Sequence, residues 1–275
     1  MKRLAGMVAA LALIAVACSS GVNSVAAVAS SPGSVGVGMQ RILLAVDNLE
    51  SGESLADPDT QVVATLRDRI GTPLGEYQGE FVWMVPNVRG LYKFEMDIPG
   101  PGTFQITLEG EAIGAPPPVG LVTVEDPQVV TPGEPAPLSD SRTTATDDLD
   151  DITTDPDPKP SFYEMTVAEA VESGPSVLVF ATPAWCTTQT CGPLLDQVKE
   201  LSDDYPDLNY VHVEIYENVD ASAFEDLMIV PAVGEWRLPS EPWVFVTDEN
   251  GTVTAAFEGV ALDIELESAF AQVSP

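Results

Sequence analysis

The chain has 275 residues, of which 43 are acidic and 11 are basic, so its formal net charge is −32 at pH 7. A protein this acidic repels phosphate backbones, which excludes nucleic acid as a partner. It also repels anionic lipid headgroups, so electrostatic attraction does not hold it at a membrane. Once a leader and linkers are subtracted, the remaining length is sufficient for two domains of about 100 residues each.

The N-terminus has the pattern of a secretory leader. Lys2 and Arg3 precede an apolar run over residues 4–17, which is shorter than the ~20 residues of a membrane-spanning helix. The run ends in "AVAC" at Cys18, and this ending resembles the signal peptide of bacterial lipoproteins. The resemblance implies that residues 1–17 are a signal peptide and that Cys18 carries the lipid. The protein would then be anchored on the extracytoplasmic face of the cell membrane. The alternative is a plain signal peptide with a secreted product.

The next two segments differ sharply in composition. Residues 18–38 are small, uncharged and rich in Ser, Gly and Ala, which predicts a flexible tether. Residues 39–126 contain roughly six or seven stretches such as "RILLAV", "EFVWMV" and "TFQITLEG", separated by turns such as "PNVRG". This pattern predicts an antiparallel β-sandwich. The hairpin "GLYKFEMDIPGPGTFQITLEG" resembles immunoglobulin-like and fibronectin-like modules, and that architectural resemblance implies no activity.

Residues 127–160 are dominated by Pro, Thr and Asp and lose regular apolar spacing. This composition predicts an acidic, extended linker. Its runs "DDLDD" and "DPDP" cluster carboxylates, which calcium prefers, but the glycine and terminal glutamate of an EF-hand loop are missing. We therefore expect no metal site here, and no cofactor.

Residues 161–275 alternate between strand and helix patterns. The segments in order are "PSVLVFAT", the amphipathic "GPLLDQVKELSDDY", "LNYVHVEIY", the hairpin "PWVFVTDENGTVTAAFEG" and the helical "ALDIELESAFAQV". The strand "VLVFA" leads into "AWC", "CGP" opens a helix, and Pro242 stands just before a later strand, where the thioredoxin family keeps a cis-proline. On these features residues 161–275 resemble the thioredoxin family, which implies an α/β thioredoxin-like fold after the all-β domain.

Cys186 and Cys191 are the candidate catalytic residues. With Cys18 lipidated, they are the two thiols that remain, and such a pair in an oxidising compartment is expected to be bonded. The resemblance implies a thiolate near a helix N-terminus and a second cysteine that releases the substrate. The implied activity is thiol–disulfide exchange with extracytoplasmic protein or peptide thiols, together with an unidentified redox partner.

The spacing of the pair predicts where the helix starts. On one α-helix, residues five apart would place their Cα atoms roughly 8 to 9 Å apart, beyond the ~7 Å that a disulfide tolerates. Proline is costly inside a helix but welcome in its first turn. Gly192 and Pro193 therefore predict a helix start near Cys191 or Gly192, with "CTTQT" as a loop that brings Cys186 within bonding reach.

Two alignments with the family assign opposite roles to the pair. With "CGP" as the anchor, Cys191 takes the N-cap place of the family's first cysteine, Leu194 stands at the second, and Cys191 is the better activated thiol. With "AWC" as the anchor, Cys186 attacks and Cys191 resolves. The spacing leaves both open and favours Cys191. Phe180 lies six residues before Cys186, where relatives often carry an acid, so no buried general base is visible at that place.

Three further residues lie close to the expected loop "CTTQT". Trp185 and Trp243 flank the cysteine and proline loops and, with Pro242, are candidates for binding a peptide substrate; plain packing accounts for the tryptophans equally well. His212 alternates with valines in "NYVHVEIY" and is expected to pack against a helix.

Two other functions fit the same residues. A non-catalytic surface binding protein would keep Cys186–Cys191 as a structural disulfide. An atypical peroxiredoxin-like thiol peroxidase would share the spacing of its two cysteines with "TPAWCTTQTC". In that family a threonine stands three residues before the peroxidatic cysteine, whereas Pro183 occupies that position here and Thr182 is displaced by one.

Overall fold

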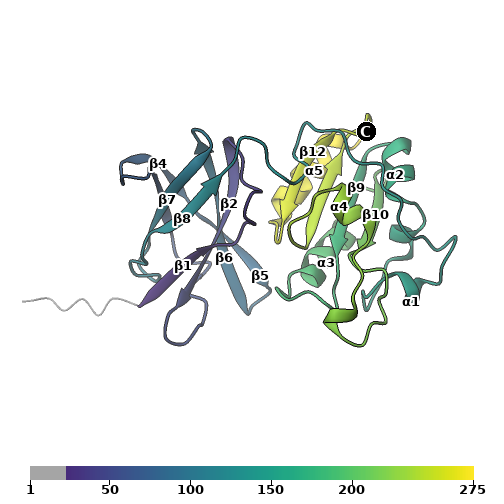
Figure 1. The fold of residues 1–275 in the computed structure, drawn as a ribbon, viewed down its shortest axis with the longest axis horizontal. Helices are drawn as coiled ribbons and strands as arrows, with labels where there is room; N and C mark the ends of the chain where they lie inside the picture. Colours follow the sequence, from purple (N-terminus) through teal and green to yellow (C-terminus); the bar gives the residue numbers. More distant parts are fainter. Residues whose placement is uncertain (1–22) are drawn as a thin grey trace, which may run out of the picture.

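A computed structural model describes residues 23–275, which form an all-β unit followed by an α/β unit (Figure 1). The predicted signal peptide, Cys18 and the start of the predicted tether lie outside the described residues. Within residues 23–275, no helix has the length and apolar character needed to span a membrane.

The N-terminal unit consists of two four-stranded antiparallel sheets that enclose one core. The first sheet has the order β1 (Ser24–Val28), β2 (Gly38–Asn48), β6 (Arg89–Ile98), β5 (Glu80–Val85), and the second β4 (Pro73–Gln78), β3 (Val63–Arg67), β7 (Gly102–Glu109), β8 (Val119–Thr123). Alternating side chains such as Leu44, Phe94 and Ile106 are buried between the sheets. This alternation is what the sequence pattern predicts for a sandwich.

The tether prediction is wrong for the part of residues 18–38 that the structure describes. Strand β1 pairs antiparallel with β2 along its whole length, and Ser31 donates its backbone N–H to Glu258 of the α/β unit at 3.0 Å. The small residues suggested a linker by composition, yet "SVAAV" can pair as a strand because backbone hydrogen bonds need no particular side chains.

The acidic segment 127–160 is also not a free linker. Val129 and Val130 are buried against the α/β unit, and Pro135 forms a β-bridge with Thr252. The regular structure of the segment is the short helix α1 (Leu149–Ile152) and, at its end, the first residue of a 3₁₀ helix. Its composition predicted an extended chain, but a few apolar residues at irregular spacing are enough to fix it against the sheet. Segment 127–160 is therefore part of the α/β unit's surface.

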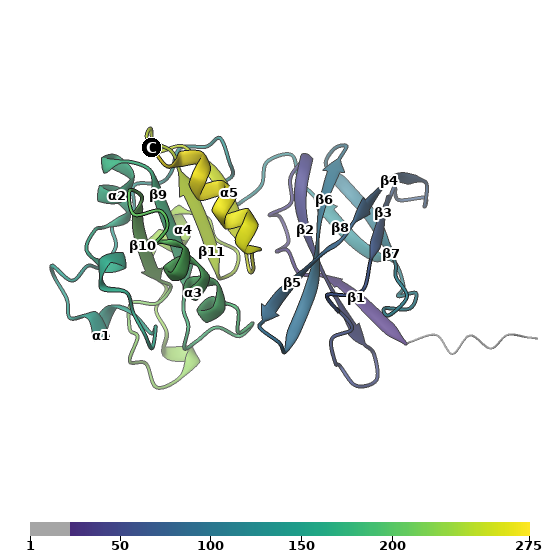
Figure 2. The same cartoon turned by 180° about the vertical axis from the view of Figure 1, so that it is seen from behind.

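The α/β unit has a four-stranded sheet in the order β10 (Asn209–Glu214), β9 (Ser176–Ala181), β11 (Trp243–Thr247), β12 (Val253–Glu258). Strands β9 and β10 are parallel and the other pairs are antiparallel. Helices α3 (Cys191–Leu201) and α5 (Asp263–Val273) cover one face, which Figure 2 shows, and α2 (Val167–Ser173) and α4 (Pro231–Glu235) lie on the other. Two short 3₁₀ helices complete the unit, η1 (Pro160–Tyr163) and η2 (Phe224–Asp226). The strand order and directions are those of the thioredoxin arrangement.

The two units contact each other through the outer face of the first sheet. Val260 packs against Leu43, and Arg41 donates two hydrogen bonds to the carboxylate of Glu265, at 2.8 and 2.9 Å. The buried ammonium of Lys93 lies 3.5 Å from the same carboxylate. Burial raises the pKa of Glu265, but Arg41 and Lys93 outweigh burial and hold that pKa below its ordinary value. Glu265 therefore links the two units as a carboxylate.

Glu265→Ala is expected to lower the free energy of unfolding by about 2 to 3 kcal/mol, because it leaves Arg41 and the buried Lys93 without their shared anion. The wild-type contribution is present above the unfolded pKa near 4.5 and is lost as pH falls through the depressed folded value. Urea unfolding at pH 7 and pH 3 measures both effects. Glu267→Ala on the same helix is the matched control, and an equal loss in that variant would contradict the role of Glu265.

Candidate redox site

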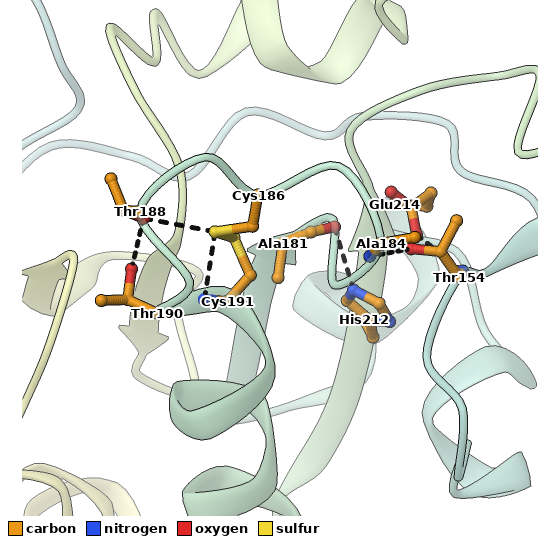
Figure 3. The surroundings of a disulfide bond; sticks show 9 residues. All are labelled: Thr154, Ala181, Ala184, Cys186, Thr188, Thr190, Cys191, His212 and Glu214. Carbon is orange, nitrogen blue, oxygen red and sulfur yellow. Dashed lines mark hydrogen bonds between the residues drawn. A yellow bond between two sulfur atoms is a disulfide. The ribbon is translucent and has the colours of Figure 1, made fainter. Parts of the chain in front are cut away.

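The two predicted catalytic cysteines are joined by a disulfide at the start of α3 (Figure 3). Strand β9 ends at Ala181 and helix α3 begins at Cys191. Between them the chain forms a loop, residues 182–190, which we call the redox loop. The Cα atoms of Cys186 and Cys191 are 6.0 Å apart. Gly192 and Pro193 occupy the first turn of α3, as their sequence predicted. One detail is corrected: Thr190 holds the N-cap position, and Cys191 is the first helical residue.

The two sulfur atoms differ in exposure. Cys191 is completely buried beside Leu194 and Leu195, whereas Cys186 is partly exposed. The backbone N–H of Cys191 donates to Sγ of Cys186 at 3.2 Å, and the hydroxyl of Thr188 lies 3.3 Å from the same sulfur. Amide donors and the positive end of the helix dipole stabilise a thiolate relative to a thiol. Cys186 is therefore the sulfur that is both reachable and stabilised as an anion.

A buried carboxylate, Glu214, lies at the carboxyl end of β10, next to the start of the redox loop. The parallel register pairs Glu214 with Ala181, the last residue of β9. Its Oε2 accepts hydrogen bonds from the backbone N–H and the hydroxyl of Thr154, both at 2.8 Å. The N–H of Ala184 in turn donates to Oγ1 of Thr154 at 3.2 Å. Figure 3 shows this chain of contacts between Glu214 and the loop that carries Cys186.

Burial raises the pKa of Glu214, and the neighbouring Thr182 hydroxyl and the hydrogen bonds from Thr154 oppose that rise. The other oxygen, Oε1, and the fully buried hydroxyl of Thr182 both lack a partner of regular hydrogen-bond geometry among the described residues. A buried acid with a raised pKa and a free oxygen is a candidate for proton exchange with a neighbouring group.

Sequence reasoning missed Glu214 because it looked for an acid at position 180, in the same strand as the cysteine loop. Phe180 instead packs on the opposite face of the sheet against Trp236 and Phe245. The acid comes from the neighbouring parallel strand. The signal available in the sequence was a glutamate that ends an otherwise apolar strand, in "NYVHVEIY".

His212 is a buried structural residue two positions before Glu214. Its Nε2 donates to the carbonyl of Ala181 at 3.2 Å, and its Nδ1 accepts from the hydroxyl of Tyr163 at 2.7 Å. Burial lowers the pKa of His212 to about 4. The neutral imidazole therefore fixes the end of β9, from which the redox loop departs.

The three predicted substrate-binding residues differ in their position relative to the redox loop. Trp185 is partly buried beside the loop. Pro242 follows a cis peptide bond, and the register of β11 places it next to the end of β9. Trp243 is instead 4% exposed and stacks on Phe245 on the face opposite α3, which corrects its prediction as a substrate contact. Val244, the next residue of β11, packs in the same cluster as Cys191, and consecutive strand residues point to opposite faces, so Trp243 lies on the other side of the sheet.

A groove of about 960 Å³ borders the redox loop and is lined by residues of segment 127–160 and of α3, with Pro183 and Ala184 between them. Residues 23–275 contain no cluster of three or more side chains suited to hold a metal ion.

No protein-family model and no curated protein matches the chain. Among solved structures, a thio-disulfide isomerase from Thermus thermophilus is 22% identical over 52% of this chain and 97% of that one, with a TM-score of 0.33. The Lin-41 filamin domain is 10% identical over 37% of this chain and 93% of that one, with a TM-score of 0.25. The strand order and directions give the α/β unit a thioredoxin-like fold. The disulfide also fits thiol–disulfide chemistry in general.

Proposed function

We propose that this protein is an extracytoplasmic, lipid-anchored thiol–disulfide oxidoreductase that acts on protein or peptide thiols through Cys186 and Cys191. The observation that carries the activity is a partly exposed sulfur at the N-terminus of α3, bonded to a buried one. The anchor at Cys18 and the extracytoplasmic location rest on the sequence resemblance to lipoproteins. The β-sandwich, proposed to be immunoglobulin-like, serves as a partner-binding or spacing module.

The proposed reaction transfers two electrons from a substrate dithiol to the protein. A substrate thiolate attacks Sγ of Cys186, the Cys186–Cys191 bond breaks, and the sulfur of Cys191 leaves as a thiolate that takes up a proton. The second substrate thiolate then attacks the substrate sulfur of the mixed disulfide. A substrate disulfide forms, and Cys186 leaves as a thiolate. The reverse sequence reduces a substrate disulfide, and a redox partner restores the starting state.

This assignment makes Cys186 the sulfur that is attacked, in contrast to the sequence preference for Cys191. The sequence argument placed the better activated thiol at the helix start. In the structure the amide of Cys191 points at the sulfur of Cys186, while the side chain of Cys191 is directed into the core. A nucleophile must approach a disulfide along the S–S axis from the open side, which only Cys186 offers.

We assign to Glu214 the exchange of the proton on Cys191. The thiol of Cys191 is sealed from solvent, so a buried acceptor is needed when it ionises. Glu214 lies on the same face of the sheet as Cys191, and Thr182, which begins the redox loop, is among the groups that interact with its carboxylate.

The reduction potential of the Cys186–Cys191 couple tests the function. Equilibration with dithiothreitol or glutathione is expected to give a value in the range of about −120 to −270 mV found for exchange-active pairs. A value below about −300 mV, together with no oxidation of any dithiol, would identify a structural disulfide in a binding protein. Formation of sulfenic acid with peroxide in a single-cysteine variant would instead indicate a thiol peroxidase.

A further inference from the structure

The chain between β10 and α4, residues 217–230, forms a loop beside the redox loop that internal hydrogen bonds hold in place. Glu217 donates its backbone N–H to the carbonyl of Met228 at 2.8 Å. The side chain of Asn218 bridges this segment, donating to the carbonyl of Asp226 at 2.7 Å and accepting from the N–H of Met228 at 2.8 Å. These bonds close the segment at its base, so its conformation is fixed. We call residues 217–230 the β10–α4 projection.

The β10–α4 projection presents large apolar side chains to solvent. Phe224 is 55% exposed, Met228 54% and Ile229 61%. The ring of Phe224 lies 6.4 Å from that of Trp185, measured between centroids, and 6.3 Å from that of Tyr216. Single exposed apolar side chains are common on protein surfaces, whereas several gathered in one patch are typical of an interaction site.

This apolar patch is continuous with the reactive disulfide. Trp185 immediately precedes Cys186, and its ring nitrogen is buried without a hydrogen-bond partner in the described structure. A chain bound over Phe224 and Trp185 would therefore reach the partly exposed sulfur directly. The patch is placed to position a substrate for the exchange reaction.

The projection also carries an unbalanced negative charge. Glu217, Asp220, Glu225 and Asp226 are all exposed, residues 217–230 include no lysine or arginine, and none of the four acids forms an ion pair with another described residue. Glu241, next to Pro242, adds to this field: burial and then the Glu241 charge raise the pKa of the nearby Tyr216 phenol.

We propose that the β10–α4 projection binds the substrate, and that the substrate is a protein segment with large apolar side chains and lysine or arginine near its cysteines. This inference rests on the proposed function and specifies its substrate class. The apolar side chains of the substrate would cover Phe224, Met228 and Ile229. Its lysine or arginine side chains would complement the four unpaired acids, which raises the association rate and disfavours acidic substrates. The same acids repel anionic lipid headgroups, so a protein fits this surface better than a membrane.

Three reduced dithiol peptides of equal length and cysteine spacing test the inference, with the full chain made as Cys18→Ser so that lipidation does not interfere. One peptide carries leucine, phenylalanine and lysine, the second replaces lysine by glutamate, and the third replaces the apolar residues by serine. The first is expected to be oxidised about tenfold faster than either of the others, and its advantage over the acidic peptide should shrink in 0.5 M salt.

A double variant locates the effect. Phe224→Ser with Met228→Ser should lower the rate for the first peptide, relative to the rate for dithiothreitol, by about tenfold. The matched control is Ile70→Ser, which removes an 87% exposed side chain from a turn of the sandwich and should leave both rates unchanged.

The outcomes separate this inference from the proposed function. Equal rates for all three peptides, with dithiothreitol still oxidised, would overturn the substrate class and leave the oxidoreductase intact. Failure to oxidise any dithiol would overturn both. Binding of the Cys18→Ser protein to phosphatidylcholine vesicles, abolished by the double variant, would assign the patch to a membrane and overturn the inference.

Discussion

Cys191→Ser is expected to stop turnover and, when a substrate disulfide is supplied, to accumulate a mixed disulfide, because the Cys186 thiolate attacks one substrate sulfur and the other leaves as a thiolate. The sulfur of Cys186 is partly exposed and accepts a hydrogen bond from the first amide of α3, so it can form this intermediate without Cys191, whereas the protein has no second thiol to resolve it in the reducing direction. Cys186→Ser is expected to stop turnover as well but to trap no substrate, because Cys191 is completely buried. Non-reducing electrophoresis and mass spectrometry of the trapped species distinguish the two variants.

Thr187→Ser is the matched control, since Thr187 is exposed in the same loop and takes no part in the proposed reaction. Its turnover should equal that of the wild type. Mixed disulfides found on Cys191 in the Cys186→Ser protein would establish the opposite alignment, in which the cysteine of "CGP" is attacked. Mixed disulfides with neither variant would favour the structural role for the pair.

The start of α3 and the closure of the disulfide were predictable because both follow from local chemistry. Pro193 fixes the first turn of a helix whatever surrounds it, and the five-residue offset then requires Cys186 to lie on a loop. The succession of strands and helices along the α/β unit followed from the alternation of apolar strands and amphipathic helices, whereas their arrangement in the sheet was implied by the resemblance to the thioredoxin family. These features depend on residues close together in the chain.

The features that could not be predicted depend on partners distant in sequence. Composition described segment 127–160 correctly as acidic and proline-rich, but it could not show that Val129 and Val130 find a buried site against the α/β unit. Trp243 is adjacent to Pro242 in sequence, yet the face of β11 on which it lies is set by the register with β9.

Glu214 illustrates the same limit at the redox site. The acid was sought six residues before Cys186, but it is supplied by β10 through the parallel pairing of Glu214 with Ala181. Which strand contributes the acid is a property of the assembled sheet. The local sequence around the cysteines therefore predicts the disulfide, whereas the proton acceptor becomes visible only once the sheet order is known.

In the reducing direction, Glu214→Gln is expected to slow the attack of Cys191 on the mixed disulfide at Cys186 by about 100-fold at neutral pH, because it removes the acceptor for the proton of Cys191. The amide keeps an oxygen for the two hydrogen bonds from Thr154, so the geometry of the site is preserved. In the wild type the rate should rise with pH as Glu214 ionises, through a pKa that burial raises above 4.5. The variant should lack that rise, which stopped-flow measurement of resolution from pH 4 to 9 would reveal.

The stability of Glu214→Gln should change in the opposite direction to its activity. Because the folded pKa is raised, the folded protein binds the proton more tightly than the unfolded chain, so the contribution of Glu214 is fully present below about pH 4.5 and is lost as pH rises through the folded value. The amide avoids this loss, so at pH 7 the variant should unfold at the same or a higher urea concentration. The exposed Glu172→Gln is the control for both measurements. A slower and less stable Glu214→Gln protein would indicate a structural role, since only a group kept for proton transfer combines lost rate with undiminished stability.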